Sequence, residues 1–431
     1  MQTIDKEKHG MPFHNNHNVF ILGAGFSVDA GLPTMKTFIP AMRHAVSWAD
    51  SMSLSDLREN IIGSLSIIAS SAKAAYRCKI DPSNIEDVFS LFDGGLENKY
   101  DDRFKRTNMQ KAIAATLESR MDDYRQHKKA AKLVLQDFVQ LSLNQAYISS
   151  LSTNAEATQQ KFIPLYEACS ALLANCFSVN GDPFNNPKNT IITFNYDTLL
   201  EESLEEMSIA YNLGITNNEG IDIDSQCANM RCDNPLSGLS ILKLHGSMNW
   251  ALKFRAHDNQ HEKSELYKSR PSLTVYKNAT DLFNDDAHLY DQLILEPPTW
   301  NKGKSAPILQ LLWDKSIEAL STATRIFIIG YSVPETDMHF KYLMATGLAN
   351  NISLEDIVIV NPSFNDSQES ARLKTRIFNT FREELEYSRT IKFLPSNASD
   401  FMLAPAGNKS LHHPHLLPFV LFPTLSHSFF A

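Results

Sequence analysis

The stretch that decides the fold is Val19-Phe20-Ile21-Leu22-Gly23-Ala24-Gly25-Phe26-Ser27-Val28-Asp29-Ala30-Gly31-Leu32-Pro33-Thr34. Four consecutive apolar residues are typical of a buried parallel strand, and here they run directly into a glycine turn. Gly23 and Gly25 allow a tight turn and a close approach of the backbone to a ligand, and a helix starting after the turn offers N–H groups to an anion. The stretch therefore predicts either a nucleotide phosphate site or a plain strand–turn–helix corner.

Two departures argue against the dinucleotide fingerprint of dehydrogenases. Val28 stands where that fingerprint has its third glycine. No acidic residue that ends a strand follows about 20 residues later to hold a ribose.

Further short apolar runs with polar or turn-forming flanks recur along the chain and predict buried strands of a mostly parallel sheet. They lie at residues 190–194, 241–244, 293–295, 326–330 and 357–360. Helix-length patterns separate several of them, as at 198–207 and 307–322. This alternation predicts an α/β, Rossmann-like fold with a doubly wound sheet.

Between about residues 48 and 180 strand signals vanish and helical periodicity dominates. Apolar stripes of period 3.6 predict helices whose faces pack on the α/β unit, on one another or, as the less favoured alternative, on another copy. The stripes are Ile85, Val88, Phe89 and Phe92, after a cap at Ser83 or Asn84, and Leu133, Val134, Phe138 and Leu141. We expect an α/β domain from 1–47 plus 185–401, a helical insertion at 48–184 and an irregular tail at 402–431. The polar stretch 255–286 predicts a long loop or a small excursion near the ligand edge of the sheet.

Composition narrows the function classes. The chain has 431 residues, 43% of them hydrophobic, and a formal net charge of −9, so direct nucleic-acid binding is not expected. No uninterrupted apolar stretch is long enough to span a bilayer, and the polar N-terminus does not resemble a secretory signal. Five scattered cysteines argue against a disulfide framework and fit a cytoplasmic location; they also lack the paired spacing of a zinc site.

Polar residues follow the predicted strand at 190–194. Thr193, Asn195 and Asp197 lie at its carboxyl end, where ligands bind in open α/β sheets. The alternative is that Asn195 and Asp197 only cap the following helix. His245 follows the strand at 241–244 and precedes Gly246, a position from which it could act as a base near neutral pH, although a lone histidine is more often structural.

Two later strands end in small or polar residues able to meet ribose or adenine. Gly330, Tyr331 and Ser332 follow one strand, and Asn361 follows the next. In the alternative interpretation these are only turns, with Pro334 and Pro362 ending the strands.

Taken in order, these segments resemble the sirtuin family. The glycine turn is similar to that family's Gly-Ala-Gly-x-Ser…Ala-Gly-(Ile/Leu)-Pro element, at Gly23, Ala24, Gly25, Ser27, Ala30, Gly31, Leu32 and Pro33. Thr193-Phe194-Asn195-Tyr196-Asp197 resembles Thr-Gln-Asn-Ile-Asp, and Leu244-His245-Gly246-Ser247 resembles Leu-His-Gly-Ser. Gly330–Ser332 and Asn361 resemble the adenosine-binding strand ends. The resemblance covers the α/β part, about half of the chain.

The resemblance implies that NAD binds as the substrate and that its nicotinamide–ribose bond is cleaved. It assigns His245 as the base and Asn195 as the residue that orients the ribose and the attacking water. Asp197 would hold the nicotinamide carboxamide. The other implied NAD-binding residues are Gly23, Ala24, Gly25, Phe26, Ser27, Pro33, Thr193, Gly330, Tyr331, Ser332 and Asn361.

The chain also departs from the family's deacylases. It lacks their four-cysteine zinc module, so no metal is expected, and 293–298 replaces the segment that helps bind an acyl-lysine peptide. The arrangement resembles the prokaryotic sirtuin-like proteins of antiviral defence, which hydrolyse NAD. We therefore expect an NAD glycohydrolase, homo-oligomeric, with a separate ATPase or other defence partner. The alternatives are a protein deacylase or ADP-ribosyltransferase, and a sensor that binds NAD or ADP-ribose without turnover.

Overall fold

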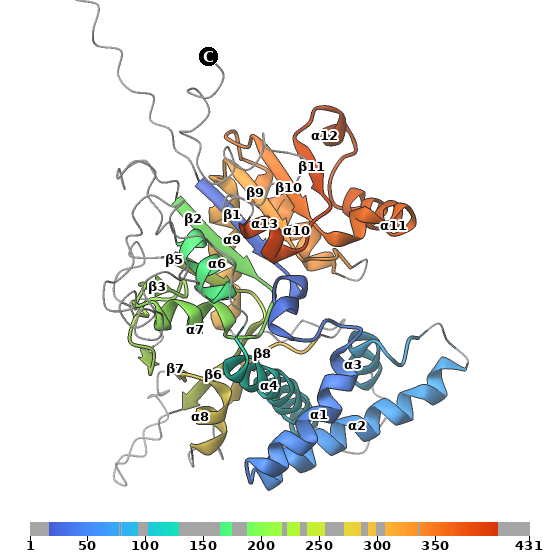
Figure 1. Ribbon diagram of the computed structural model, residues 1–431, viewed down its shortest axis with the longest axis vertical. Helices are drawn as coiled ribbons and strands as arrows, with labels where there is room; N and C mark the ends of the chain where they lie inside the picture. Colours follow the sequence, from blue (N-terminus) through green and yellow to red (C-terminus); the bar gives the residue numbers. More distant parts are fainter. Residues whose placement is uncertain are drawn as a thin grey trace, which may run out of the picture.

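The core of the protein is a sheet of seven parallel strands in the order β11-β10-β9-β1-β2-β5-β3 (Figure 1). The computed structural model describes residues 17–76, 78, 80–93, 102–128, 164–174, 188–217, 222–232, 239–254, 271–285, 292–298, 307–334 and 337–403. The strands are β1 (His17–Leu22), β2 (Lys188–Thr193), β3 (Tyr211–Asn212), β5 (Leu239–Lys243), β9 (Arg325–Ile329), β10 (Asp356–Val360) and β11 (Ile391–Leu394).

Strand β1 lies at the centre of this sheet, as its continuous apolar sequence predicts. The residues from Val19 to Leu22 are at most 1% exposed, and Phe20 stacks on its register partner Phe327 with ring centroids 4.9 Å apart. Strands covered on both faces need apolar side chains on both faces. The predicted α/β fold is confirmed.

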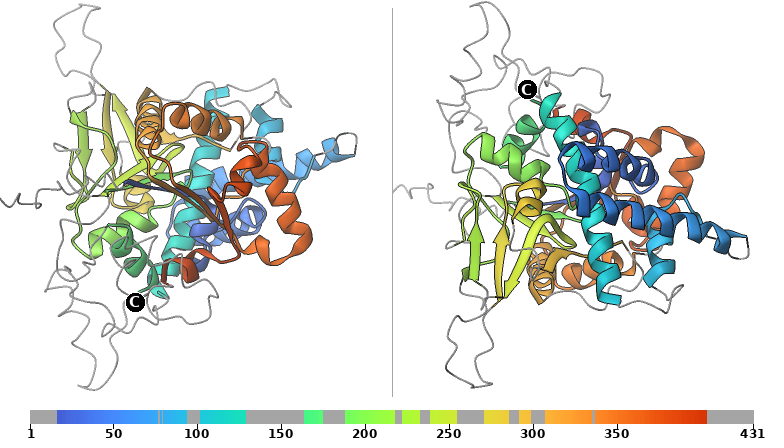
Figure 2. Two further views of the ribbon diagram at one scale, coloured as in Figure 1. Left: turned by 90° about the horizontal axis from the view of Figure 1, so that it is seen from above. Right: turned by 90° about the horizontal axis from the view of Figure 1, so that it is seen from below.

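Helices cover both faces of the sheet (Figures 1 and 2). One face carries α6 (Leu165–Leu173), α7 (Leu199–Glu206) and α13 (Ala398–Leu403), and the other carries α9 (Pro307–Ser321) and α10 (Met338–Leu348). The chain between β10 and β11 forms η7 (Pro362–Asn365), α11 (Ser367–Phe378) and α12 (Glu384–Tyr387).

The helix predicted directly after the glycine turn is not an α-helix. Two short 3₁₀ helices follow instead, η1 (Ala24–Phe26) and η2 (Val28–Ala30), and the first α-helix, α1 (Phe38–Ser51), begins later. Gly31 ends η2 with a left-handed φ of 84°, and Pro33 lacks the N–H that a continuing helix would need.

A second sheet, in the order β4-β7-β6-β8, lies beyond the carboxyl ends of the parallel strands (Figure 1). It contains β4 (Asp222–Ser225), β6 (Gly246–Phe254), β7 (Pro271–Val275) and β8 (Gln292–Leu295). Strand β6 is antiparallel to both β7 and β8. The prediction that residues 293–295 belong to the parallel sheet is therefore wrong.

The stretch 255–286 contains β7 and α8 (Ala279–Asn284), so the long-loop alternative is wrong in part, whereas the small-excursion alternative is not contradicted. Their apolar faces are short and lie within a polar segment, so the sequence pattern does not reveal them. In the structure Leu273, Val275 and Leu282 are all buried. Residues 255–270 and 286 lie outside the described residues.

The helices between β1 and β2 include α1, α2 (Ser55–Ala75), α3 (Ile85–Asp93) and α4 (Asp102–Gln126), which lie by the carboxyl ends of the parallel strands (Figure 1). Ile85, Val88 and Phe89 are buried as predicted, and Asn84 Oδ1 accepts from the N–H of Glu86. The side chain of Phe92 and the stripe at 133–141 lie outside the described residues.

The expected domain boundaries stay a prediction. The boundary after residue 47 falls within α1, and α13 continues to Leu403, beyond the expected start of the tail. Residues 404–431 are not described.

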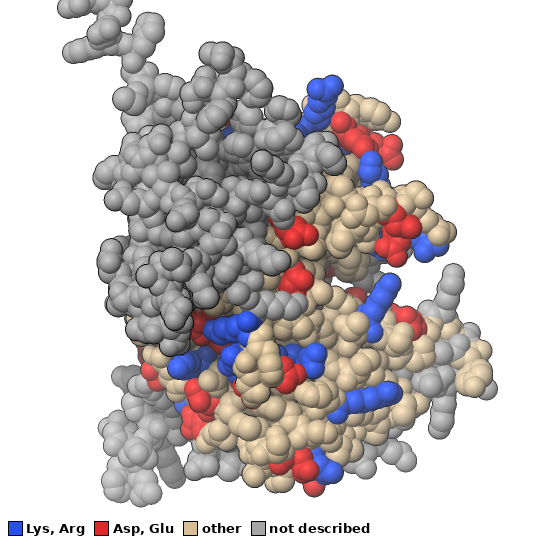
Figure 3. All heavy atoms as spheres, in the orientation of Figure 1, with Lys and Arg blue, Asp and Glu red and all other residues tan. Residues whose placement is uncertain are grey.

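Acidic and basic side chains are interspersed on the described surface shown in Figure 3. None of the described helices has the length and apolar character needed to cross a membrane.

Candidate functional site

The strand register brings the predicted site residues to one edge of the parallel sheet. Leu22 pairs with Thr193 on β2 and with Ile329 on β9, and these strands in turn align with β5 and β10. The residues that follow the strands therefore share the carboxyl edge, where the chain order reverses on either side of β1. Four strand spacings separate β5 from β10, roughly 19 Å, so this edge suits an elongated ligand.

The glycine turn packs tightly against the end of β9. The Gly23 N–H donates to Ile329 O at 3.0 Å, and the Gly25 N–H donates to Gly330 O at 2.8 Å. A Cβ at Gly330, whose φ is 64°, would lie 2.3 Å from Phe26 N, and one at Gly25 would lie 2.7 Å from Gly330 Cα. Contact between two backbone segments thus already requires glycine here, and close approach to a ligand stays a prediction.

Asn195 is turned into the glycine turn and does not cap α7. Its Nδ2 donates to Gly23 O at 3.0 Å and to Ser27 Oγ at 3.2 Å. The Ser27 hydroxyl donates to Asp197 Oδ2 at 3.0 Å. Asn195 is half-buried, whereas Ser27 and Asp197 are buried. Asn195, Ser27 and Asp197, which come from β1 and β2 loops far apart in sequence, form one hydrogen-bonded group that we call the Asn195–Ser27–Asp197 cluster.

Asp197 also meets the start of α7, in partial agreement with the capping alternative. Its Oδ1 accepts from the Leu199 N–H at 3.2 Å. Burial raises the pKa of the Asp197 carboxyl, and the Lys243 ammonium and the Ser27 hydroxyl oppose this increase. The carboxylate is thus held by two donors within the protein.

His245 lies beside two aromatic rings at the end of β5. Its ring contacts Phe194 edge-on, with centroids 5.2 Å apart, and lies 6.1 Å from the ring of Tyr196. Its backbone oxygen accepts from the Glu296 N–H at 2.8 Å, which joins the histidine to the end of β8. His245 is 8% exposed.

Several predicted binding residues have side chains that serve the fold. Tyr331 is buried and stacks on Phe194 at 4.9 Å, while its hydroxyl donates to Asp337. Thr193 donates to Leu22 O at 3.2 Å. Phe26 and Pro33 are buried. The side chains of these four residues therefore pack inside the protein, below the sheet edge.

The remaining predicted residues are more accessible or act as caps. Ala24, Gly25 and Gly330 are half-buried, and Ser332 is exposed. Asn361 Oδ1 accepts from the Ser363 N–H at 3.0 Å and so caps η7.

Helix α4 covers the outer edge of β8, next to His245. Gln110 Nε2 donates to Leu295 O at 2.7 Å and to Leu293 O at 3.3 Å, and Arg106 forms an ion pair with Glu296. Strand β8 is the last strand of its sheet, so these carbonyls are where a further strand would pair. The helical segment thus occupies the edge that an extended peptide would need.

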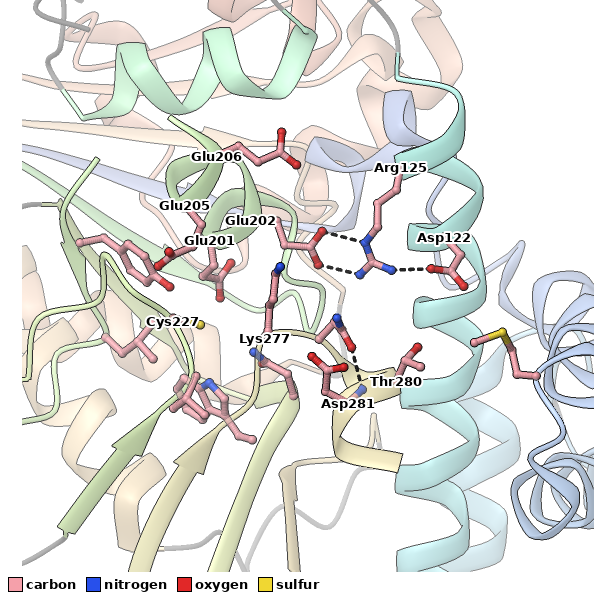
Figure 4. A pocket seen from close by; sticks show the side chains of 17 residues that line it. Asp122, Arg125, Glu201, Glu202, Glu205, Glu206, Cys227, Lys277, Thr280 and Asp281 are labelled. Atoms are coloured by element: carbon pink, nitrogen blue, oxygen red, sulfur yellow. Dashed lines mark hydrogen bonds and ion pairs between the residues drawn. The ribbon is translucent and has the colours of Figure 1, made fainter. Parts of the chain in front are cut away.

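A separate cavity of about 380 Å³ lies where α4, α7, α8 and the second sheet meet (Figure 4). Glu201, Glu202, Glu205 and Glu206 of α7 line it, with Asp122 and Arg125 of α4 opposite. Arg125 binds Glu202 through both of its carboxylate oxygens, at 2.7 and 2.9 Å. None of the predicted site residues lines this cavity. Among the described residues, no group of three or more His, Cys, Asp or Glu is arranged to hold a metal ion.

Residues that the sequence did not identify connect these regions. Lys243 is 1% exposed and donates to Glu201 Oε1 at 2.7 Å and to the backbone oxygen of Asp197. The available signal was a charged residue inside the apolar run 241–244. Gln110 and Arg106 gave no comparable signal, because polar residues on a long helix are ordinary.

Comparison with known proteins gives a partial match. Residues 189–380 match the family model of a SIR2-like domain, which starts at β2 and ends after α11. No curated protein matches the chain.

Solved structures similar to this chain include a Sir2 homologue mutant in complex with 2′-O-acetyl ADP ribose, at 12% identity and a TM-score of 0.32, with 90% of each chain covered. A Sir2 homologue in complex with NAD has 13% identity and a TM-score of 0.27, covering 90% of this chain and 88% of that one. A Sir2Tm structure bound to a propionylated peptide has 10% identity and a TM-score of 0.32, covering 91% and 92%. The likeness to these structures is too distant to assign a function.

Proposed function

We propose that this sirtuin-like chain, whose residues 189–380 match a SIR2-like domain, is an NAD⁺ glycohydrolase that releases nicotinamide and ADP-ribose. The SIR2-like match supports an NAD-related function. The Asn195–Ser27–Asp197 cluster and His245, which lie at one sheet edge, supply the groups that the chemistry needs.

The proposed reaction breaks the bond between nicotinamide N1 and ribose C1′, and the bonding electron pair leaves with nicotinamide as a neutral amide. The oxygen of water bonds to C1′, and His245 accepts the proton that the water loses. Asn195 is held by two hydrogen bonds through Nδ2, which leaves Oδ1 to orient the water. Asp197 would accept from the nicotinamide carboxamide. The rate enhancement would come from positioning NAD and the attacking water, and from excluding other water molecules from the site.

The observation that favours hydrolysis over transfer to a peptide is the position of α4 on the edge of β8. Gln110 already bonds the outward carbonyls of Leu293 and Leu295 beside His245. An acyl-lysine peptide adding as a strand would have to displace this side chain and the Arg106–Glu296 pair. An attacking water molecule does not need to pair with the edge of β8.

The test is to incubate the full-length protein with NAD and to identify the products chromatographically. We expect release of nicotinamide with ADP-ribose, and a loss of roughly 100-fold or more in His245→Ala and in Asn195→Ala. His44→Ala and Asn350→Ala change the same residue types at exposed positions and should keep the wild-type rate. NAD consumption that requires an acetylated peptide would favour the deacylase, and tight NAD binding without turnover would favour the sensor.

We also propose a biological setting of antiphage defence in the cytoplasm, with activation through a homo-oligomer or a separate ATPase partner. The resemblance to defence proteins supports this. In cells challenged with phage, the NAD pool should fall with the wild-type protein and stay constant with Asn195→Ala. An equal fall with both proteins would contradict the proposal.

A further inference from the structure

Lys243 is a buried lysine that the proposed reaction does not use. It is the last residue of β5, two positions before His245, and its side chain is 1% exposed. A buried ammonium is expensive unless charged or polar partners satisfy it. Glu201 Oε1 lies 2.7 Å from its Nζ, and the backbone oxygen of Asp197 accepts a second hydrogen bond.

These contacts fix the segment that carries Asp197. The Asp197 backbone oxygen is held by Lys243, while its carboxylate is held by Ser27 and by the Leu199 N–H. Three elements thus converge on one residue: the turn after β1, the end of β5 and the start of α7. Lys243 thus joins the end of β5, two residues before His245, directly to the backbone of Asp197.

The charges around Asp197 come from every element packed on it. Lys243 of β5 is the cation, and Glu201 and Glu202 of α7 are anions. Tyr166 of α6 is a phenol whose pKa is raised mainly by burial, then by Cys169 and Asp29, and least by Asp197. Burial raises the pKa of both Asp197 and Glu201, and Lys243 acts against both increases. Removing Lys243 would leave two buried carboxyls close together with no compensating ammonium.

We propose that Lys243, held in place by Glu201, is a positioning residue that fixes Asp197 where its carboxylate can accept a hydrogen bond from the nicotinamide carboxamide. This inference rests on the proposed NAD hydrolysis. Glu201 also lines the cavity of Figure 4, and Lys243 joins it to Asp197 of the Asn195–Ser27–Asp197 cluster.

The two partners should have opposite effects on the pH dependence. Lys243→Met removes the positive charge, so the acidic limb of kcat/KM for nicotinamide release should move to higher pH by about one unit or more. Glu201→Gln removes a negative charge and keeps the ammonium, so the limb should move to lower pH. The double variant Lys243→Met/Glu201→Gln leaves no unpaired charged partner and serves where the single lysine variant fails to fold. Its limb should lie between those of the two single variants.

Binding gives a second measurement that does not depend on turnover. In a His245→Ala background, calorimetry with NAD and with ADP-ribose isolates the contribution of the nicotinamide group. Lys243→Met should reduce the ratio of NAD to ADP-ribose affinity near neutral pH by about tenfold, and the ratio should recover at higher pH.

The outcomes separate this inference from the proposed function. Equal loss of rate at all pH values, with unmoved limbs and an unchanged affinity ratio, would mean that Lys243 has a merely structural role and would overturn the inference while hydrolysis stands. A pH-dependent affinity ratio without nicotinamide release would refute the hydrolase and support the positioning role. Failure to bind NAD would overturn both.

Discussion

Gly330→Ala tests whether the contact between the glycine turn and β9 holds the candidate site together. Gly330 has a φ of 64°, and an added Cβ would lie 2.3 Å from Phe26 N and 2.4 Å from Gly25 C. Both are backbone atoms, so no side chain can rotate away. The hydrogen bond from the Gly25 N–H to Gly330 O, at 2.8 Å, would also be strained.

The cost has two parts. An alanine in the left-handed region costs about 1–2 kcal/mol. Forcing a methyl group into closely packed backbone costs about 1–3 kcal/mol more. The sum is about 2–5 kcal/mol of unfolding free energy, a large part of a domain's net stability. Because the strain falls on the turn that Asn195 contacts, NAD turnover should fall as well.

Urea unfolding of the full chain measures this cost, and two other glycines separate its parts. Gly31 also has a positive φ, 84°, but a Cβ there would lie in open space, 3.9 Å from Arg120 Nη2. Gly31→Ala should therefore lose only about 1–2 kcal/mol of unfolding free energy. Gly63 lies in α2 with nothing within 4 Å, so Gly63→Ala should gain about 0.5–1 kcal/mol. The expected order of stability is Gly63→Ala, wild type, Gly31→Ala, Gly330→Ala.

The result that would refute this reasoning is equal stability of Gly330→Ala and Gly31→Ala. It would mean that the turn and the end of β9 can separate without a cost in stability. Wild-type turnover in Gly330→Ala would show in addition that the site does not depend on it.

Three further predictions concern stability. Burial lowers the pKa of His17 to about 4. The free energy of unfolding should therefore fall by about 3 kcal/mol as the pH drops from about 6.5 toward 4, because protonation of this buried imidazole favours the unfolded chain. Urea titrations should show this loss in the wild type and not in His17→Gln. Gln110→Leu leaves two carbonyls of β8 without their donor and should cost about 1–3 kcal/mol, whereas Gln126→Leu, exposed on the same helix, should change stability by less than about 0.5 kcal/mol. Arg125→Met removes the cationic partner of the buried Glu118, which keeps the Ala279 N–H and the Thr280 hydroxyl as donors, and should cost about 3–5 kcal/mol by the same titration. Adding Glu118→Gln should restore part of this stability; no recovery would assign the loss to other contacts of Arg125.

The sequence predicts the parallel sheet well because each central strand is covered on both faces. Residues 326–330 and 357–360 must be apolar throughout, and that pattern is visible without neighbours. The same pattern misassigns 293–295, since an apolar run indicates burial but not the partner strand or its direction. Strand β6 was missed because Gly246 suggests a turn, although the strand begins at that residue.

The candidate site, like the sheet, can be predicted from the sequence only in part. Strand ends predict that Asn195, Asp197 and His245 share one edge, because parallel strands align their carboxyl ends. Which group each side chain contacts depends on loops from distant parts of the chain. The turn of Asn195 toward Ser27, and the stacking of Tyr331 on Phe194, are decided by packing that no local pattern encodes.

Helix α4 contacts two elements that flank the candidate site. Through Gln110 it occupies the edge of β8 beside His245, and about four turns later Arg125 binds Glu202 at the start of α7, one residue after the partner of Lys243. The helix therefore contacts both the strand that flanks His245 and the helix that follows Asp197. A movement of α4 would alter the two ends of the proposed catalytic machinery together, so the helical segment is better regarded as a wall of the site than as an appendage.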